Sequence, residues 1–331
     1  MQILFPDYYH KFHCLAGNCP DSCCKDWAVQ IDEDSARRYR ALPGNLGNAL
    51  RENLKEEDGE TVLALTPEGR CPMWQQDGLC RIHAELGENL LCHTCKDFPR
   101  LRHEYGDFTE LGLELSCPEA ARFILSGLCQ YTAASASGGE PPEYNPEIMS
   151  TLLHNRKTAL NLIADPTFSI GEALAVLLLY GYAVQEELDG GAPAQLDVAS
   201  ALNTCRKIAR PGDPAQLLNF YKNLEILTPT WRQLLDSPAP TSWQDAHRAM
   251  AQYLIMRYWL QSISDFDLVG RVKFCIVSCL VTKLVGGDLL RTAQLYSKEI
   301  ENDLDNVYAI LDGAYTEPAL ADVALLGYLL E

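Results

Sequence analysis

From residue 146 onward, apolar side chains recur at every third or fourth position, the spacing that places them on one face of an α-helix. Polar residues fill the positions between them, so each segment has a buried side and a solvated side. The pattern predicts helices over residues 146–164, 170–188, 194–208, 214–227, 243–262, 268–285, 288–301 and 319–330.

Local signals at the ends of these segments agree with the apolar spacing. Ser169 and Glu172 are placed to form a capping box at the start of the second helix. Gly286 and Gly287 follow the apolar run 268–285, where glycine commonly ends a helix. No fixed repeat period stands out, so the pattern predicts an all-α bundle and not a solenoid.

The chain before residue 133 has a different, irregular pattern. It predicts short helices over 34–41 and 119–130, a short strand over 61–65, and a small hairpin around Asp77-Gly78. Residues 133–145 are rich in Ser, Gly and Pro, which is typical of a linker. We therefore expect a mainly α fold with a cysteine-rich N-terminal region over 1–132, a linker over 133–145, and a helical domain over 146–331.

Length and composition indicate a protein that folds without disulfides. The chain has 331 residues, of which 47% are hydrophobic, enough to bury a sizeable core. The N-terminus shows neither a cationic start nor an uninterrupted apolar run, so we expect no secretory signal and a reducing, cytoplasmic location. The longest dense apolar run, 173–184, is too short to span a bilayer, so we expect no membrane partner.

The charge distribution narrows the choice of partner. The formal net charge is −18, and acidic residues exceed basic ones both in 1–132 (21 against 13) and in 133–331 (24 against 14). Nucleic acid is excluded as an expected partner, because phosphate binding needs a basic face. An acidic surface tolerates a cationic substrate, such as a protein with accessible lysines.

Cysteine is the residue type that carries the candidate chemistry. The sequence has thirteen cysteines, and the nine that we predict as metal ligands are Cys14, Cys19, Cys23, Cys24, Cys71, Cys80, Cys92, Cys95 and Cys117. Thiolates are soft ligands that select zinc, copper(I) or iron–sulfur clusters. Clustered thiols in a reducing compartment therefore point to metal or redox chemistry. Cys205, Cys275 and Cys279 lie in helical patterns and are expected in the core.

The spacing of the nine cysteines favours iron over zinc. Zinc sites usually show two close Cys-x2-Cys pairs, whereas here only Cys92 and Cys95 have that spacing. Three cysteines precede proline (Cys19-Pro20, Cys71-Pro72 and Cys117-Pro118), as the last ligand of bacterial ferredoxin runs does. We expect one or two [4Fe–4S] clusters. Zinc and ordinary buried cysteines remain as alternatives.

Two common motifs for S-adenosylmethionine or nucleotide chemistry are missing from the sequence. A radical S-adenosylmethionine enzyme would show Cys-x3-Cys-x2-Cys. Cys19 and Cys23 fit the first two positions of this motif, but Asp26 stands where the third cysteine would be. No Gly-x-Gly-x-x-Gly follows a predicted strand, so a Rossmann-type domain is not visible. A nucleotide-like cofactor must therefore bind in another way.

Several short motifs carry a resemblance to a known family. Phe5-Pro-Asp-Tyr-Tyr9, Cys19-Pro-Asp-Ser-Cys-Cys24 and Leu91-Cys-His-Thr-Cys-Lys-Asp-Phe-Pro-Arg100 resemble the flagellin lysine-N-methylase family. Residues 23–99 are similar to the wider zinc- or iron-chelating CxxCxxCC domain, although Cys14, Cys19 and Cys23 depart from that spacing. The resemblance implies methyl transfer from S-adenosylmethionine to lysine ε-amines of flagellin, with an iron–sulfur centre on the cysteines.

Such a transfer needs a base, because an ammonium group has no lone pair with which to attack. Tyr8, Tyr9 and Asp97 are the candidate catalytic residues, since they lie in motifs close to the cysteines, and Arg100 is the candidate cofactor-binding residue because it could clamp a carboxylate. Each also has a structural interpretation: the tyrosines could pack on the core, and Asp97 could pair with Arg100. The rival function is a non-catalytic iron–sulfur or zinc protein that serves electron transfer, metal delivery or scaffolding.

Overall fold

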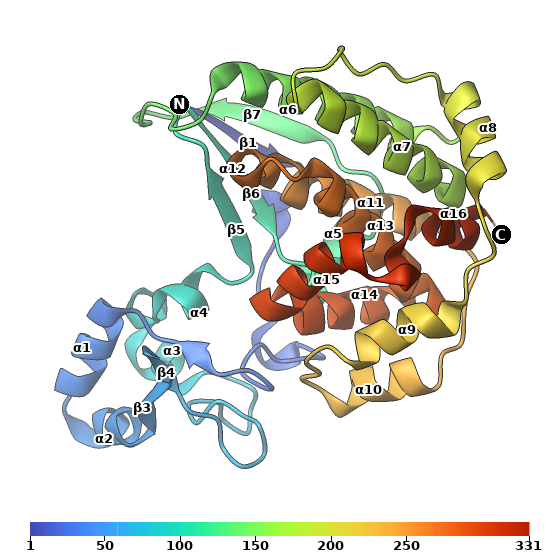
Figure 1. Cartoon of the computed structure of the whole chain (residues 1–331). Coiled ribbons are helices and arrows are strands. Elements are labelled where there is room, and N and C mark those ends of the chain that lie inside the picture. The colour runs from blue at the N-terminus through green and yellow to red at the C-terminus, as the bar shows by residue number, and fades with distance from the viewer. Residues whose placement is uncertain (58, 331) are drawn as a thin grey trace.

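A computed structural model describes residues 1–57 and 59–330 and shows a mainly helical molecule with a smaller unit projecting from it (Figure 1). The mainly α fold class is confirmed. The helical body consists of α6 (Pro146–Ala164), α7 (Ile170–Leu188), α8 (Val198–Ile208), α9 (Pro214–Lys222), α10 (Pro229–Asp236), α11 (Asp245–Tyr258), α12 (Ser262–Asp265), α13 (Leu268–Val285), α14 (Leu289–Tyr296), α15 (Leu304–Thr316) and α16 (Asp322–Leu330).

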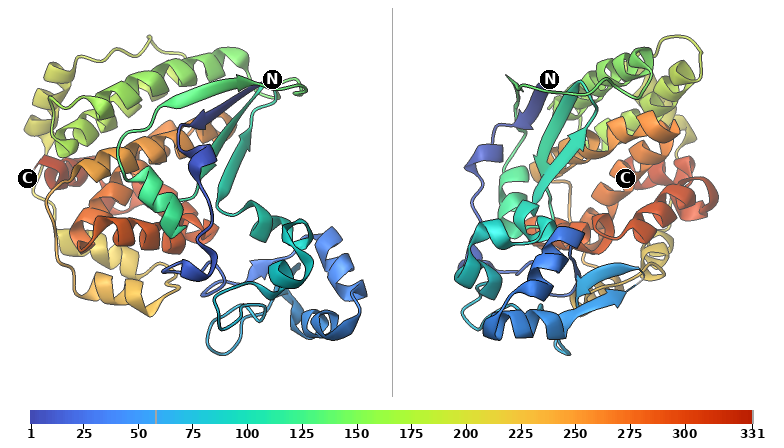
Figure 2. Two further views of the ribbon diagram at one scale, coloured as in Figure 1. Left: turned by 180° about the vertical axis from the view of Figure 1, so that it is seen from behind. Right: turned by 90° about the vertical axis from the view of Figure 1, so that its left-hand side faces the viewer.

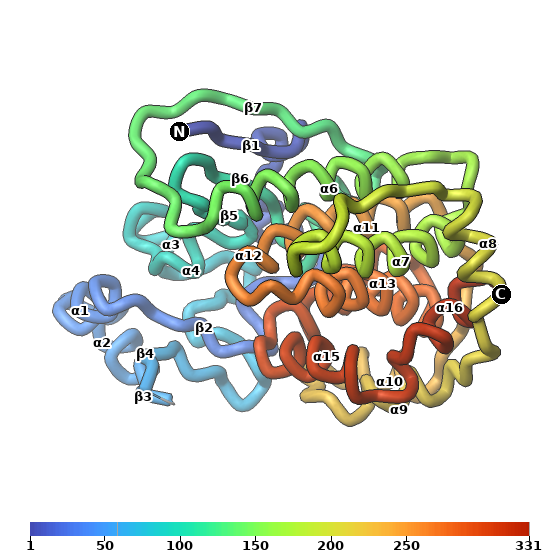
Figure 3. Tube along the Cα trace, turned by 45° about the horizontal axis from the view of Figure 1, so that its top comes forward, coloured from blue at the N-terminus to red at the C-terminus, as the bar shows by residue number. Residues whose placement is uncertain are grey.

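Helix α13 is the centre of this body. All of its residues except Lys283 are buried, and α7, α11, α14 and α15 pack around it (Figure 3). The capping box at Ser169 and Glu172 forms as predicted, and α13 ends at Gly286, whose φ of 73° suits glycine. These local signals explain why α6, α7 and α13 have the predicted bounds.

The other helices predicted after residue 146 are shorter than expected, and several helices, in the body and in the projecting unit, were not predicted. The segment predicted over 243–262 is interrupted by the 3₁₀ turn η4 (Trp259–Gln261). The segment predicted over 288–301 changes after Tyr296 into the π-helical η5 (Ser297–Glu301). Helices α10 and α15 were not predicted, although Thr228 and Asp303 cap their first turns.

A four-stranded sheet, which the sequence did not predict, covers one side of the body (Figure 2). Its strands lie in the order β5-β6-β1-β7, where β1 pairs parallel to β6 and antiparallel to β7. The strands are β1 (Gln2–Pro6), β5 (Arg100–Glu104), β6 (Phe108–Leu113) and β7 (Tyr131–Ser135), and helix α5 (Pro118–Ile124) lies between β6 and β7 in the chain. The helix predicted over 119–130 therefore ends early.

The projecting unit carries Cys71, Cys80, Cys92 and Cys95. It is built from β2 (Val29–Gln30), α1 (Glu33–Ala41), α2 (Gly44–Asn53), β3 (Leu54–Glu57), β4 (Glu60–Leu63), α3 (Arg81–Leu86), η3 (Glu88–Leu90) and α4 (His93–Asp97). The strands form a small antiparallel sheet in the order β2-β4-β3. The turn expected at Asp77-Gly78 is present, with an isolated bridge between Trp74 and Cys80 in place of full strands.

Strand β7 extends to Ser135 and so overlaps the start of the linker expected over 133–145, which stays a prediction. The small Ala and Ser residues have the composition of a linker, but the backbone from Tyr131 to Ser135 pairs with β1. The segment after β7 is also tied down, because the Tyr144 hydroxyl donates to Asp107 at 2.6 Å.

The buried residues form two clusters that do not follow the predicted division of the chain at residues 132 and 146. That division stays a prediction. One cluster of buried residues joins Tyr8, Phe12 and 113–125 to the helical body, and a second comprises residues between Val29 and Cys92. None of the helices that the structure describes is long and apolar enough to cross a membrane.

Candidate metal centre

The nine predicted ligand cysteines fall into two groups in the structure. We call the first the Cys117 group; its members are Cys14, Cys19, Cys23 and Cys117. Burial, together with the nearby thiols of Cys19 and Cys14, raises the pKa of the Cys117 thiol to about 11. Cys14 and Cys117 in turn lie close enough to Cys23 to raise its pKa. Cys117 thus lies near three thiols of the N-terminal segment, about a hundred residues earlier in the chain.

The second group lies in the projecting unit, and we call it the Cys71 group; its members are Cys24, Cys71, Cys80, Cys92 and Cys95. Burial raises the pKa of the Cys71 thiol to about 12, with further contributions from Cys24, Cys80 and Cys92. The backbone of Cys71 donates to the Cys24 carbonyl at 2.7 Å, which fixes the two segments side by side. Cys71 and Cys92 are buried, and the other three are partly buried.

Two pairs of thiols within this arrangement are hydrogen-bonded. The Cys23 thiol donates to Cys24, which lowers the pKa of Cys24 to about 7 and raises that of Cys23. Cys92 and Cys95 form an equivalent pair, in which the hydrogen bond lowers the pKa of Cys92 and raises that of Cys95. In each pair the hydrogen bond thus favours the thiolate of one member, Cys24 or Cys92, and the thiolate is the form that binds metal.

Three of the cysteines stand directly before short helices. Cys80, Cys92 and Cys117 occupy the N-cap positions of α3, α4 and α5. Backbone N–H groups of the first turn face the thiol, as those of His83 and Ile82 do at Cys80, and they lower its pKa against the larger effect of burial. Amide hydrogens directed at sulfur stabilise the thiolate.

The donor set fits a thiolate-ligated group in its chemistry. All thirteen cysteines are free, and nine of them gather in the two groups. Among the described residues, however, no three His, Cys, Asp or Glu side chains converge closely enough to hold one metal ion.

The π-helix η5 connects the helical body to the cysteine segment. Lys298, whose side chain is only 2% exposed, lies 2.7 Å from the Asp26 carboxylate and 3.5 Å from that of Asp21. Its ammonium group also lies over the Trp27 ring, 4.9 Å from the centroid. Gln294 adds hydrogen bonds to Asp21 at 3.0 Å and to the Ser116 carbonyl at 2.7 Å. These contacts hold the segment that carries Cys19, Cys23 and Cys24.

The same π-helix contributes to a buried polar network that sequence reasoning missed. Glu301 accepts from the hydroxyls of Tyr253 at 2.8 Å and Ser297 at 2.6 Å, and Arg257 donates to it at 3.1 Å. Burial raises the pKa of the nearby Glu114, although Arg257 opposes this. The widened turn of a π-helix is often associated with function, but an apolar pattern does not distinguish it from an α-helix.

A cavity of about 490 Å³ adjoins the Cys117 group. Leu15, Pro20 and Pro118, each directly after a cysteine of this group, line one side of it. The opposite side comes from the start of α10 and from α14. The charged lining residues are Asp21, Lys25, Glu119, Arg122, Asp288 and Arg291. A volume of this size suits a small organic ligand.

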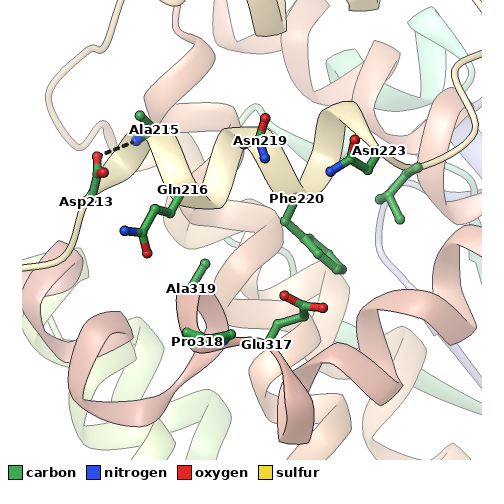
Figure 4. Close-up of a pocket in the computed structure, with 10 residues that line it drawn as sticks. Asp213, Ala215, Gln216, Asn219, Phe220, Asn223, Glu317, Pro318 and Ala319 are labelled. Carbon is green, nitrogen blue, oxygen red and sulfur yellow. Dashed lines mark hydrogen bonds between the residues drawn. The ribbon is translucent and has the colours of Figure 1, made fainter.

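A second cavity, of about 610 Å³, lies between α9 and the turn at Glu317 (Figure 4). Amide side chains from Gln216, Asn219 and Asn223 line it together with the carboxylates of Asp213 and Glu317. It has no cysteine in its lining, and α9 lies on the far side of the body from the projecting unit in Figures 1 and 2. We therefore place the candidate chemistry at the other cavity.

The structure brings only some of the predicted catalytic and cofactor-binding residues close together. Tyr8 is 7% exposed and stacks on Phe123, and burial raises its pKa strongly, which disfavours a phenolate base there. Tyr9, Asp97 and Arg100 lie near one another, because Arg100 and Asp97 both act on the pKa of Tyr9, which burial raises. Asp97 is exposed. The roles assigned to these residues stay predictions.

Arg100 and the remaining cysteines have plain structural surroundings. The Arg100 guanidinium lies over the Phe12 ring, 5.4 Å from its centroid. Cys205, Cys275 and Cys279 are buried in the helical body, as predicted. Cys129, outside the predicted ligand set, directs its thiol and backbone N–H at Gln252.

Comparison with known proteins finds relatives in Salmonella. Proteins named lysine-N-methylase from Salmonella typhimurium and Salmonella choleraesuis are each 32% identical over 127 residues, which is 37% of this chain and 32% of the relative. The flagellar biosynthetic protein FliU of Salmonella muenchen is 32% identical over 127 residues, covering 75% of that protein. The match thus spans about a third of the two lysine-N-methylases. No family model and no solved structure matches the chain.

Proposed function

Because the chain belongs to the flagellin lysine-N-methylase family, we propose that it transfers methyl groups to the ε-amines of lysine side chains on a protein. The sequence relationship is the observation that carries this proposal. The acidic balance of the chain, with a net charge of −18, suits a lysine-bearing protein such as flagellin as the partner.

S-Adenosylmethionine is the proposed methyl donor, and when bound it supplies a methyl group on a positively charged sulfur. The neutral lysine amine attacks the methyl carbon, so that a C–N bond forms and the C–S bond breaks. The electron pair of that bond stays on sulfur, and the products are methyllysine and S-adenosylhomocysteine. The proton of the lysine ammonium passes to a base before the attack.

The base in this proposal is a group near the cysteine segment. Tyr9 and Asp97 retain this role better than Tyr8, which lies in the core. Asp97 is exposed at the end of α4, where a substrate amine can reach it. A raised pKa makes the phenolate of Tyr9 less accessible.

The proposal also includes two iron–sulfur centres, one on each group of cysteines. The Cys117 group offers four thiols, the number that one [4Fe–4S] centre takes, and the Cys71 group offers five. Bound there, such a centre would supply fixed geometry and, if its potential allows, electrons. The chain's own contribution is to direct amide hydrogens at the sulfurs and to hold the Cys19–Cys24 segment against η5 through Lys298.

The test combines metal analysis with a methylation assay. Protein purified without oxygen would be analysed for iron, zinc and acid-labile sulfide, and its visible spectrum recorded before and after dithionite. Flagellin incubated with this protein and S-adenosylmethionine should gain the mass of one or more methyl groups on lysine. Iron without methyl transfer, on any lysine-bearing protein tried, would favour the non-catalytic rival. Zinc in a colourless sample would contradict the iron–sulfur part.

A further inference from the structure

The cavity beside the Cys117 group has a balanced set of charges. Asp21, Glu119 and Asp288 supply three carboxylates, and Lys25, Arg122 and Arg291 supply three cations. A site for a lysine side chain alone would need only negative charge. A balanced lining suits a zwitterion, which carries an ammonium and a carboxylate in one molecule.

Most of these charges already have partners, and one does not. Lys25 pairs with Asp21 at 2.6 Å, and Arg122 pairs with Glu119 at 2.7 Å. The Arg291 guanidinium makes neither a hydrogen bond nor an ion pair with any residue that the structure describes. It is exposed at the cavity and is free to receive a carboxylate in a bidentate arrangement.

Most of the uncharged residues that line the cavity are apolar. Leu15, Pro20 and Pro118 come from the cysteine segment and α5, while Leu290 and Leu295 come from α14. Such surfaces pack well against a flat aromatic base or a thioether chain. The volume of about 490 Å³ lies within the range of sites for small organic ligands and below the needs of an extended peptide.

We propose that this cavity is the binding site for S-adenosylmethionine, with Arg291 receiving the α-carboxylate of its amino-acid end. Asp288, whose carboxylate accepts only from the backbone N–H of Leu290 among the described residues, supplies negative charge for the ammonium. This inference rests on the proposed function, because it names the site of that reaction's methyl donor. It places the donor beside the cysteines Cys14, Cys19 and Cys117, whose neighbours Leu15, Pro20 and Pro118 form the cavity wall.

Calorimetric titration with S-adenosylhomocysteine, which cannot react, tests the site without an activity assay. Full-length protein purified without oxygen should bind it, and Arg291→Met should bind about tenfold to hundredfold more weakly, since a hydrogen-bonded charge pair is lost. Arg232→Met is the matched control, because Arg232 lies outside the cavity lining and donates to the Lys222 carbonyl. That variant should bind as the unaltered protein does.

A second variant fills the cavity without changing its charge. Thr230 lies exposed on the rim at the start of α10, so Thr230→Trp should block binding while the melting temperature stays the same. Thr204→Trp, on the exposed face of α8, provides the control. If the unaltered protein binds the probe and both cavity variants bind it equally well, the site is elsewhere and the proposed function stands. If the unaltered protein binds neither S-adenosylhomocysteine nor S-adenosylmethionine, both proposals fail.

Discussion

The ammonium group of Lys298 lies 2.7 Å from the carboxylate of Asp26, although the two residues are 272 positions apart in the chain. Lys298 sits in the π-helical turn η5 and is nearly inaccessible to water. Asp26 follows Cys23 and Cys24 in the segment that joins the two groups of thiols. One buried cation therefore ties the helical body to the candidate metal centre.

Lys298→Met should loosen that segment. The carboxylates of Asp21 and Asp26 would keep their partial burial but lose a charged partner, at a cost of about 1 to 3 kcal/mol. Hydrogen exchange should accelerate in residues 19–27 while the centre of α13 keeps its protection. Lys207→Met, on the exposed end of α8, controls for the loss of one positive charge. Equal exchange in both variants would show that Lys298 does not anchor the segment.

Removing single thiols should separate the two groups of cysteines. Cys117→Ser should lower the iron content by about half if each group carries one [4Fe–4S] centre of four thiolates. Cys71→Ser should remove the other half, whereas Cys129→Ser, outside both groups, should change nothing. Iron and sulfide analysis of protein purified without oxygen measures this. Complete loss of iron from either variant alone would point to a single centre.

The sheet and helix α6 are joined by a buried ion pair. Arg156 donates two hydrogen bonds to Glu110 in β6, and both side chains are about 5% exposed. Arg156→Met should destabilise the protein by about 3 to 5 kcal/mol, because it leaves an uncompensated buried carboxylate. Glu110→Leu combined with Arg156→Met should recover most of that loss. Denaturant unfolding of both variants checks the prediction, which fails if the double variant is the less stable.

His247 should make the protein sensitive to acid. It is fully buried, and burial lowers its pKa to about 4. The unfolded chain takes up a proton near pH 6.5 that the folded chain takes up only near pH 4, so stability falls as pH decreases through this window. The resulting loss in the free energy of unfolding is at most about 3 kcal/mol.

Unfolding measured at pH 7 and at pH 5 tests this contribution. His247→Gln should reduce the difference in stability between the two pH values, since glutamine does not titrate. His10→Gln, at an exposed position, should leave the difference unchanged. An identical pH dependence in all three proteins would exclude His247 as the cause.

The sequence predicted the parts of the fold that depend on local signals. Helices α6, α7 and α13 have the expected bounds, because Asn145, Ser169 and Gly286 supply the capping and ending chemistry within a few residues. The caps at Thr228 and Asp303 would have revealed α10 and α15 if a shorter apolar pattern had been accepted.

The four-stranded sheet could not be predicted in the same way. Strand β7 is a run of small residues that is held by backbone pairing with β1, and its composition is that of a linker. Strand β5 alternates charged residues with Leu101 and His103, and only its pairing with β6 defines it as a strand. Pairing between distant segments leaves little trace in local composition.

At the candidate metal centre too, the sequence shows local features but not the contacts between distant segments. The sequence singles out the nine cysteines, whose role as ligands stays a prediction. It does not show their division into two groups, since Cys23 and Cys24 are neighbours in sequence and belong to different groups. Cys117 joins Cys14 across a hundred residues of chain, because α5 returns to the N-terminal segment.

The parallel pairing of β1 with β6 sets an order of events during synthesis. Gln2 pairs with Phe108, so the first strand leaves the ribosome long before its neighbour exists. At roughly 5 to 20 residues per second, the wait is on the order of ten seconds. The residues between Val29 and Cys92, which share their own buried cluster, are all translated within that interval. All five thiols of the Cys71 group therefore exist before β6 does, whereas the Cys117 group is complete only once Cys117 has been translated.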